Sequence, residues 1–324
     1  MAATGLYIHR SSYIENIPTL HLMRRRNYLR LLLVFTGCII FPATVLADPT
    51  AQKSSGASSG SSASSAGGGS SDIKAANNQI GYQSISTSVS YTETGNGVQT
   101  TAGTLDTETG AISGSAYYFS AMNDVLLGND YFRATYDMSI GYTNYIGASL
   151  NLPNGPTGVY GSLVGTSSAV LKNITARYGK GFAYRGNAML TPYFEIGVHT
   201  WDRGVNGGER YSHNYYAYGL LTQYSLGNKL VLSVDAMGGH TNGSAIAVTS
   251  TTQITGFTTA LGDSELYKIG VALDYALGAK LHVNAGVDYT AFVYGISATQ
   301  PSGLLEPDSN TNYITVRFGL GWGF

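Results

Sequence analysis

The chain ends in the sequence YITVRFGLGWGF, residues 313–324. Every second residue of this stretch is large and apolar, in the order Ile314, Val316, Phe318, Leu320, Trp322 and Phe324. The residues between them are polar or glycine. A repeat of two residues is the repeat of a β-strand, in which successive side chains point to opposite faces. The stretch therefore predicts a final strand with one apolar face, which we expect to face lipid.

The same stretch resembles the C-terminal assembly signal of bacterial outer-membrane β-barrel proteins, which ends in Phe and alternates apolar residues. The residues that carry this resemblance are Tyr313, Phe318, Leu320, Trp322 and Phe324. The resemblance implies an all-β fold, a transmembrane antiparallel up-and-down barrel in the bacterial outer membrane. It also implies contact with outer-membrane lipids and recognition by the outer-membrane insertion machinery, and we expect the barrel to be a monomer.

The composition agrees with a barrel better than with membrane-spanning helices. Of the 324 residues only 11% are charged, and 42 are Gly and 25 are Tyr. The mean hydropathy is −0.01, as expected where lipid-facing and lumen-facing residues alternate, whereas a spanning helix needs about 20 consecutive apolar residues.

The start of the chain has the layout of a secretory signal peptide. An apolar run over residues 31–47 follows Arg24, Arg25, Arg26 and Arg30 and ends in small residues at Ala47. We predict a signal peptide over 1–47, with Met23 as an alternative true start. Residues 48–78 are rich in Ser, Gly and Ala and predict a flexible linker, and 79–324 form the barrel.

Removal of the leader changes the charge and the cysteine content. The leader holds five of the 18 basic and one of the 19 acidic residues, so the remainder has 13 basic and 18 acidic residues, a net charge of −5. This balance argues against nucleic-acid binding. The single cysteine, Cys38, lies in the leader, so we expect no disulfide and no thiolate metal site.

The alternation predicts ten strands, with eight or twelve as alternatives because residues 245–261 could hold a further hairpin. Gly-containing pairs at 186–187, 227–228 and 278–279 predict tight turns after even-numbered strands. Short and long connections then alternate, which places both barrel termini in the periplasm. The ten predicted segments are 80–92, 111–122, 131–145, 169–181, 189–203, 211–226, 229–242, 264–277, 280–297 and 311–324.

The alternation also predicts which charged residues point into the lumen. They carry both signs, which favours a network of ion pairs that fills a narrow barrel, with a selective pore as the alternative. The predicted lumen residues are Arg133, Asp137, Arg177, Glu195, Asp235, Lys268, Asp274, Asp288 and Arg317.

The hairpin over residues 189–226 brings together the candidate catalytic residues. His199 and His213 face each other near the outer rim, with Asp202 and Glu209 in the adjoining loop. An acid/base pair or a weak metal site is conceivable there, but girdle and loop packing is the simpler interpretation. Residues 106–110 predict a solvated turn in the first loop.

These patterns leave two functions open. The first is a structural, surface-interaction or narrow-pore role in the outer membrane. The alternative is an outer-membrane hydrolase, a protease or lipid deacylase, that uses the rim histidines, although the chain shows no complete motif of either kind. We expect no cofactor and no metal.

Overall fold

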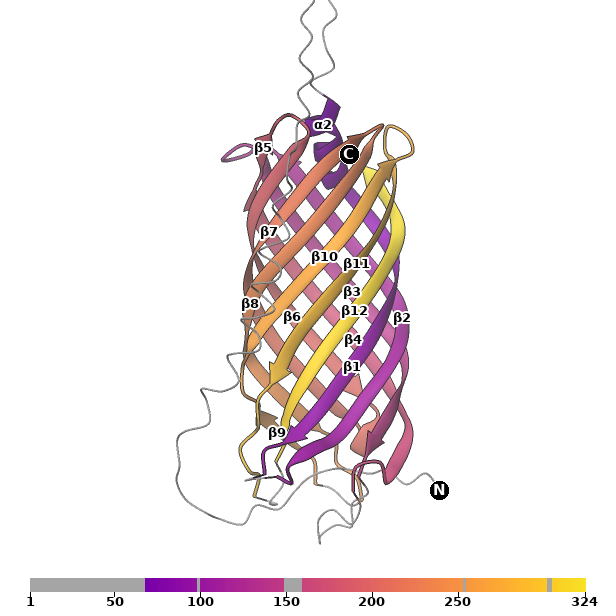
Figure 1. Ribbon diagram of the computed structural model, residues 1–324, viewed down its shortest axis with the longest axis vertical. Helices are drawn as coiled ribbons and strands as arrows, with labels where there is room; N and C mark the ends of the chain where they lie inside the picture. The colour runs from indigo at the N-terminus through magenta and orange to yellow at the C-terminus, as the bar shows by residue number, and fades with distance from the viewer. Residues whose placement is uncertain (1–67, 98–99, 149–158, 253–254, 302–304) are drawn as a thin grey trace, which may run out of the picture. The chain divides into compact units, whose positions relative to one another are not determined.

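The computed structural model describes residues 68–97, 100–148, 159–252, 255–301 and 305–324. The predicted signal peptide, the alternative start at Met23 and residues 48–67 of the predicted linker lie outside the described residues. Ten long antiparallel strands close into a barrel (Figure 1), which confirms the predicted fold and the strand count of ten.

Each barrel strand pairs with its neighbours along the chain, and the last strand pairs with the first. Closure leaves no open edge among the barrel strands, which satisfies the backbone hydrogen bonds without water. The barrel strands are β1 (Gln79–Gly95), β2 (Gly103–Asn123), β3 (Asp130–Gly147), β4 (Leu163–Lys180), β6 (Ala188–Arg203), β7 (Glu209–Gly227), β8 (Leu230–Val248), β10 (Glu265–Ala276), β11 (Leu281–Tyr294) and β12 (Asp308–Gly323).

Two short strands do not cross the barrel. Strand β5 (Phe182–Tyr184) pairs only with β6, and β9 (Phe257–Ala260) pairs only with the end of β8. Strand β10 therefore pairs with β8 directly. Residues 245–248 at the end of β8 pair with residues 257–260 of β9 at the rim, and the barrel closes with ten strands, so the alternative of twelve barrel strands is wrong.

The predicted tight turns are present. Gly186 and Gly227 adopt positive φ angles of 74° and 83°, and Asn228 adopts 50°, the left-handed conformation that tight hairpin turns require. Strand β1 begins beside the end of β12, with Gln79 opposite Gly323. Both ends of the barrel domain thus lie at the same mouth as these turns, beside the label C in Figure 1.

The apolar face of each strand lies on the outside of the barrel. The side chains of Phe318 and Trp322 on β12, and of Phe324 directly after it, are 56% to 60% exposed. Arg317 directly precedes Phe318 in sequence and points inward, where it pairs with Asp288. Buried large side chains fill much of the interior, so the core of this fold is the lumen.

A helix, α2 (Gly68–Asn77), precedes the barrel and covers the mouth that holds the termini (Figure 1). It packs mainly against β7 and also touches β2, β6, β8 and β10. Ile73 is fully buried, and Asn77 Nδ2 donates to Gln223 Oε1 at 2.6 Å. The prediction of a flexible linker over 48–78 was therefore wrong for residues 68–77, because packing stabilises a helix that the sequence does not favour.

In the described part of the chain, no helix has both the length and the hydropathy to span a membrane.

Candidate functional site

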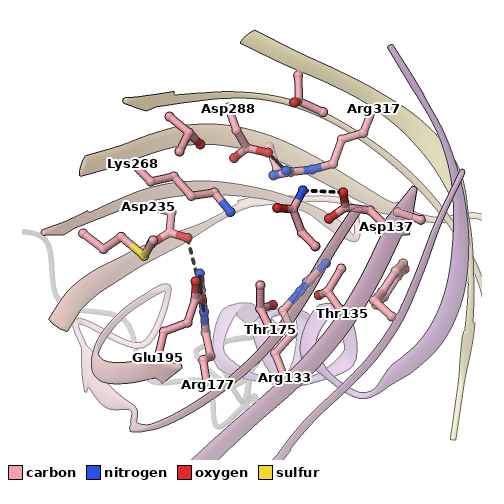
Figure 2. A pocket seen from close by; sticks show the side chains of 18 of the residues that line it. Arg133, Thr135, Asp137, Thr175, Arg177, Glu195, Asp235, Lys268, Asp288 and Arg317 are labelled. Carbon is pink, nitrogen blue, oxygen red and sulfur yellow. Dashed lines mark hydrogen bonds and ion pairs between the residues drawn. The ribbon is translucent and has the colours of Figure 1, made fainter. Parts of the chain in front are cut away.

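The barrel interior contains a polar cavity of about 200 Å³ (Figure 2). It extends from Asn77 of α2 to His199 and His213 on β6 and β7. All nine charged residues that the sequence predicts in the lumen line it, namely Arg133, Asp137, Arg177, Glu195, Asp235, Lys268, Asp274, Asp288 and Arg317.

Arg177 on β4 organises one side of this cavity. Its Nε donates to Glu195 Oε2 at 2.7 Å, and its Nη1 donates to Asp235 Oδ2 at 2.7 Å. The guanidinium also lies 3.9 Å from the centre of the Tyr193 ring. Tyr215 and Tyr193 donate their hydroxyls to the remaining oxygens of Glu195 and Asp235, at 2.8 and 2.5 Å. This cluster satisfies both buried carboxylates.

The opposite side of the cavity is less completely paired. Arg317 forms an ion pair with Asp288, and Asn173 Nδ2 donates to Asp137 Oδ1 at 2.7 Å. Within the described residues, Lys268 and Arg133 form no ion pair with a carboxylate. Two of the four Lys and Arg residues that line the cavity therefore have no carboxylate partner in the part of the chain that the structure describes.

At the mouth near α2, the remaining carboxylate of the cavity has a histidine partner. His282 Nδ1 lies 2.6 Å from Asp274 Oδ1, and Gln79 Nε2 donates to the other oxygen of Asp274 at 3.0 Å. This pair lies close to the helix, because the Gln79 amide also donates to the carbonyl of Ala76, the next to last residue of α2.

His199 and His213 do meet, as the alternation predicts, but as packed rings. They are opposite each other in the β6–β7 register, with ring centres 4.8 Å apart and planes inclined by 27°. His199 Nδ1 donates to Asn173 Oδ1 at 2.6 Å, and His213 Nδ1 lies 2.9 Å from the Tyr294 hydroxyl. Phe292 packs edge-on against both rings.

The two candidate carboxylates do not join the histidines. Asp202 lies in β6, where it pairs with the exposed Arg210 at 2.5 Å. Glu209 lies in β7 and accepts from Arg203 at 3.2 Å. Within the described residues, no three His, Cys, Asp or Glu side chains form a group that could hold a metal ion. The four rim candidates therefore do not form one acid/base site.

Arg203 instead centres a layer of buried charges at the mouth opposite α2. Its side chain is 0% exposed and lies over the rings of Tyr91 and Trp201, 4.4 and 5.0 Å from their centres. We call this group, with the carboxylates that follow, the Arg203 layer. Its carboxylates, with their N–O distances to Arg203, are Glu108 at 2.7 Å, Glu209 at 3.2 Å, Asp106 at 3.3 Å and Glu93 at 3.4 Å.

The sequence interpretation missed most of this layer. Asp106 and Glu108 belong to β2, so the solvated turn predicted over 106–110 is wrong. Strand β2 begins well before its apolar stretch. The side chains of Asp106 and Glu108 point inward to the guanidinium of Arg203. The alternation around Asp106 is weak because the adjacent Leu105 is also buried. The ion pairs of Asp106 and Glu108 with Arg203 show that these side chains point inward.

A fifth carboxylate reaches the layer from the connection between β11 and β12. Glu306 is 4% exposed and accepts a hydrogen bond from the Tyr211 hydroxyl. Burial, followed by repulsion from Glu209, raises the pKa of Glu306 to about 8. Its carboxyl is therefore mainly protonated at neutral pH, which limits the negative charge around the single guanidinium of Arg203.

Comparison with known proteins adds no assignment of activity. No family model matches the chain, and no curated protein matches it. Among solved structures, the outer membrane protease OmpT from Escherichia coli is similar over 76% of this chain and 95% of its own, with 10% identity and a TM-score of 0.47. The translocator domain of the autotransporter NalP from Neisseria meningitidis (76% and 89% covered, 13% identity, TM-score 0.36) is also similar.

The toluene transporter TodX from Pseudomonas putida matches with 9% identity and a TM-score of 0.28, over 76% of this chain and 90% of its own. These neighbours differ in activity, and the similarity is low. The fold assignment rests on the strand pairing of the chain itself.

Proposed function

We propose that this chain is an integral protein of a bacterial outer membrane whose lumen is closed, so that the barrel anchors and displays its loops and does not act as an open channel. The observation that carries this proposal is the occupation of both mouths. Helix α2 covers one mouth and the Arg203 layer fills the other, with the ion-pair network between them.

The distribution of charge supports the membrane location. Arg133, Arg177, Lys268 and Arg317 face the interior cavity, whereas each would cost about 2 to 4 kcal/mol on the lipid face at the bilayer midplane. Outward positions carry aromatic side chains near the termini, such as Trp322 and Tyr275, which are 56% and 44% exposed. This is the girdle pattern of a spanning barrel.

The lengths of the connections support an orientation. The mouth with the termini carries short turns, including those at 228–229 and 277–280, whereas the other mouth carries longer connections such as 249–264 and 295–307. In outer-membrane barrels the short turns are periplasmic and the long loops extracellular. We place both termini of the barrel in the periplasm and the Arg203 layer at the cell surface.

The partners follow from the same proposal. A barrel delivered unfolded to the outer membrane requires the insertion machinery, with the terminal strand and Phe324 as its assembly signal. Outer-membrane lipids then surround the apolar band. Because the ladder closes on itself, pairing between barrel strands of different copies is not needed, and we propose a monomer.

Conductance in a planar bilayer tests the closed lumen. We expect the full-length mature protein, checked for folding by its heat-dependent mobility on gels, to insert without producing a steady open current. Stable, reproducible channel currents from the folded protein would contradict the proposal and favour the narrow pore. The hydrolase alternative has no support from the geometry of His199, His213, Asp202 and Glu209.

A further inference from the structure

The central cavity contains two cationic side chains that pair with no carboxylate of the described residues. Lys268 Nζ has no hydrogen bond or ion pair with the residues that the structure describes. The guanidinium of Arg133 contacts the face of the Tyr118 ring, 4.6 Å from its centre, and reaches no carboxylate in the same part of the chain. Both side chains are partly buried, and a charge that has lost part of its water is costly unless another group or the remaining water compensates it.

The carboxylates of the cavity are already engaged by other groups. Glu195 and Asp235 both bind Arg177, and Asp288 binds Arg317. Asp137 accepts from the amide of Asn173 at 2.7 Å, and Asp274 lies beside His282. Each of these five carboxylates thus has a partner other than Lys268 and Arg133.

The cavity that these cations line has room for a further group. Figure 2 shows the ends of Lys268, Arg133 and Arg317 pointing into the same central space. The volume of about 200 Å³ exceeds the cavity volume of about 10 to 15 Å³ that a single water needs. Thr135 and Thr175 also line the space and carry hydroxyl donors.

We propose that this cavity binds a small oxyanion, of the size of phosphate or acetate, with Lys268 and Arg133 as its counter-charges. Charge-assisted hydrogen bonds from an ammonium and a guanidinium are the strong contacts that such an anion makes. The cavity reaches Asn77 of α2, the helix at the mouth with the termini. This binding does not depend on whether the barrel conducts.

Isothermal titration of the folded, full-length mature barrel in a zwitterionic detergent tests the proposal, with inorganic phosphate, acetate and chloride as separate titrants. We expect phosphate or acetate to bind, and Lys268→Met and Arg133→Met each to weaken binding about tenfold or more. The control is Lys172→Met, because Lys172 on β4 alternates with the cavity-lining Leu171 and Asn173 and so faces outward.

Three outcomes would overturn the proposal: no binding at millimolar phosphate or acetate, equal affinity in the Lys268→Met variant, or chloride binding as tightly as either oxyanion. A preference for phosphate or for acetate would identify the class of ligand. Should a methionine variant fold poorly, Lys268→Gln keeps a hydrogen-bond donor without the charge. The midpoint temperature of thermal unfolding then serves as a second measurement. Added oxyanion should raise this midpoint for the wild type and not for the Lys268 variant.

Discussion

At the scale of single residues, two arginines on one hairpin show how burial decides the value of an ion pair. Arg203 and Arg210 lie near the two ends of the β6–β7 connection and both pair with acidic residues. The side chain of Arg203 is 0% exposed, whereas that of Arg210 is 60% exposed. An exposed pair contributes about 0 to 1 kcal/mol, whereas removing one partner from a buried cluster costs about 3 to 5 kcal/mol.

Replacement of each arginine by methionine should therefore give unequal losses. We expect Arg203→Met to lower the free energy of unfolding by about 3 to 5 kcal/mol, because four carboxylates lose the cation that they share, and Arg210→Met by at most about 1 kcal/mol. Urea unfolding in detergent, followed by tryptophan fluorescence, measures both, since Trp201 lies against Arg203. Equal losses would show that the Arg203 layer does not stabilise the fold.

Glu306 should make stability depend on pH in a stated direction. Its pKa rises from the ordinary value of 4.5 to about 8 in the folded protein, so the folded state keeps a proton that the unfolded state releases. The contribution of Glu306 to the free energy of unfolding is then greatest below about pH 4.5. It falls as the pH rises to about 8, by up to about 1.4 kcal/mol per pH unit.

The substitution Glu306→Gln should remove this contribution, because glutamine stays neutral at every pH. We expect the unfolding midpoint to fall less between pH 5 and pH 8 in this variant than in the wild type. Glu265→Gln, at an exposed position where β10 begins at the same mouth, is the matched control. The assignment fails if both variants follow the wild-type profile.

At the scale of the element, the last strand carries the proposed assembly signal and also packs against the start of the barrel. Phe324 stacks on Phe119 of β2 across β1, with ring centres 5.5 Å apart and planes inclined by 7°. Its backbone N–H also donates to the carbonyl of Asn78 at 3.3 Å. The end of the chain thus joins β12, β1 and β2 at the mouth with the termini.

Deletion of Phe324 should lower the amount of folded barrel in the outer membrane, because both the proposed assembly signal and this contact are lost. The folded fraction is measured from the heat-dependent gel mobility of outer-membrane extracts. Tyr275→Ala removes an outward aromatic side chain of β10 near the same mouth and should leave the yield close to normal. Wild-type levels after deletion of Phe324 would count against the assembly signal.

The elements that could be predicted from the sequence are those whose faces differ in environment. The side chains of β12 point alternately outward and into the lumen, so its sequence shows the two-residue repeat of a strand. Helix α2 has no comparable pattern: its sequence GGSSDIKAAN resembles a linker, and contacts such as Asn77 to Gln223 bridge segments far apart in the chain. The Arg203 layer escaped prediction for the same reason, because its charged residues come from four strands and a loop.

At the scale of the whole molecule, the barrel has two closures that differ in construction. Helix α2 is a separate element that packs on the barrel through Ile73, whose side chain is fully buried. The Arg203 layer is built from the strands themselves and cannot leave the lumen without unfolding of the rim. Two barriers in series predict that opening one mouth alone does not produce a pore.

Single and double variants in a planar bilayer separate these barriers. Ile73→Asp places a carboxylate at a fully buried site and should release α2 from the barrel. Hydrogen exchange over residues 68–77 verifies this release. The control is Lys74→Ala, at a partly exposed position, which should leave the helix in place. We expect Ile73→Asp alone to remain silent, and Ile73→Asp combined with Arg203→Met to conduct. A current from Ile73→Asp alone would show that the Arg203 layer is no barrier. Silence of the folded double variant would instead place the closure in the central ion-pair network around Arg177.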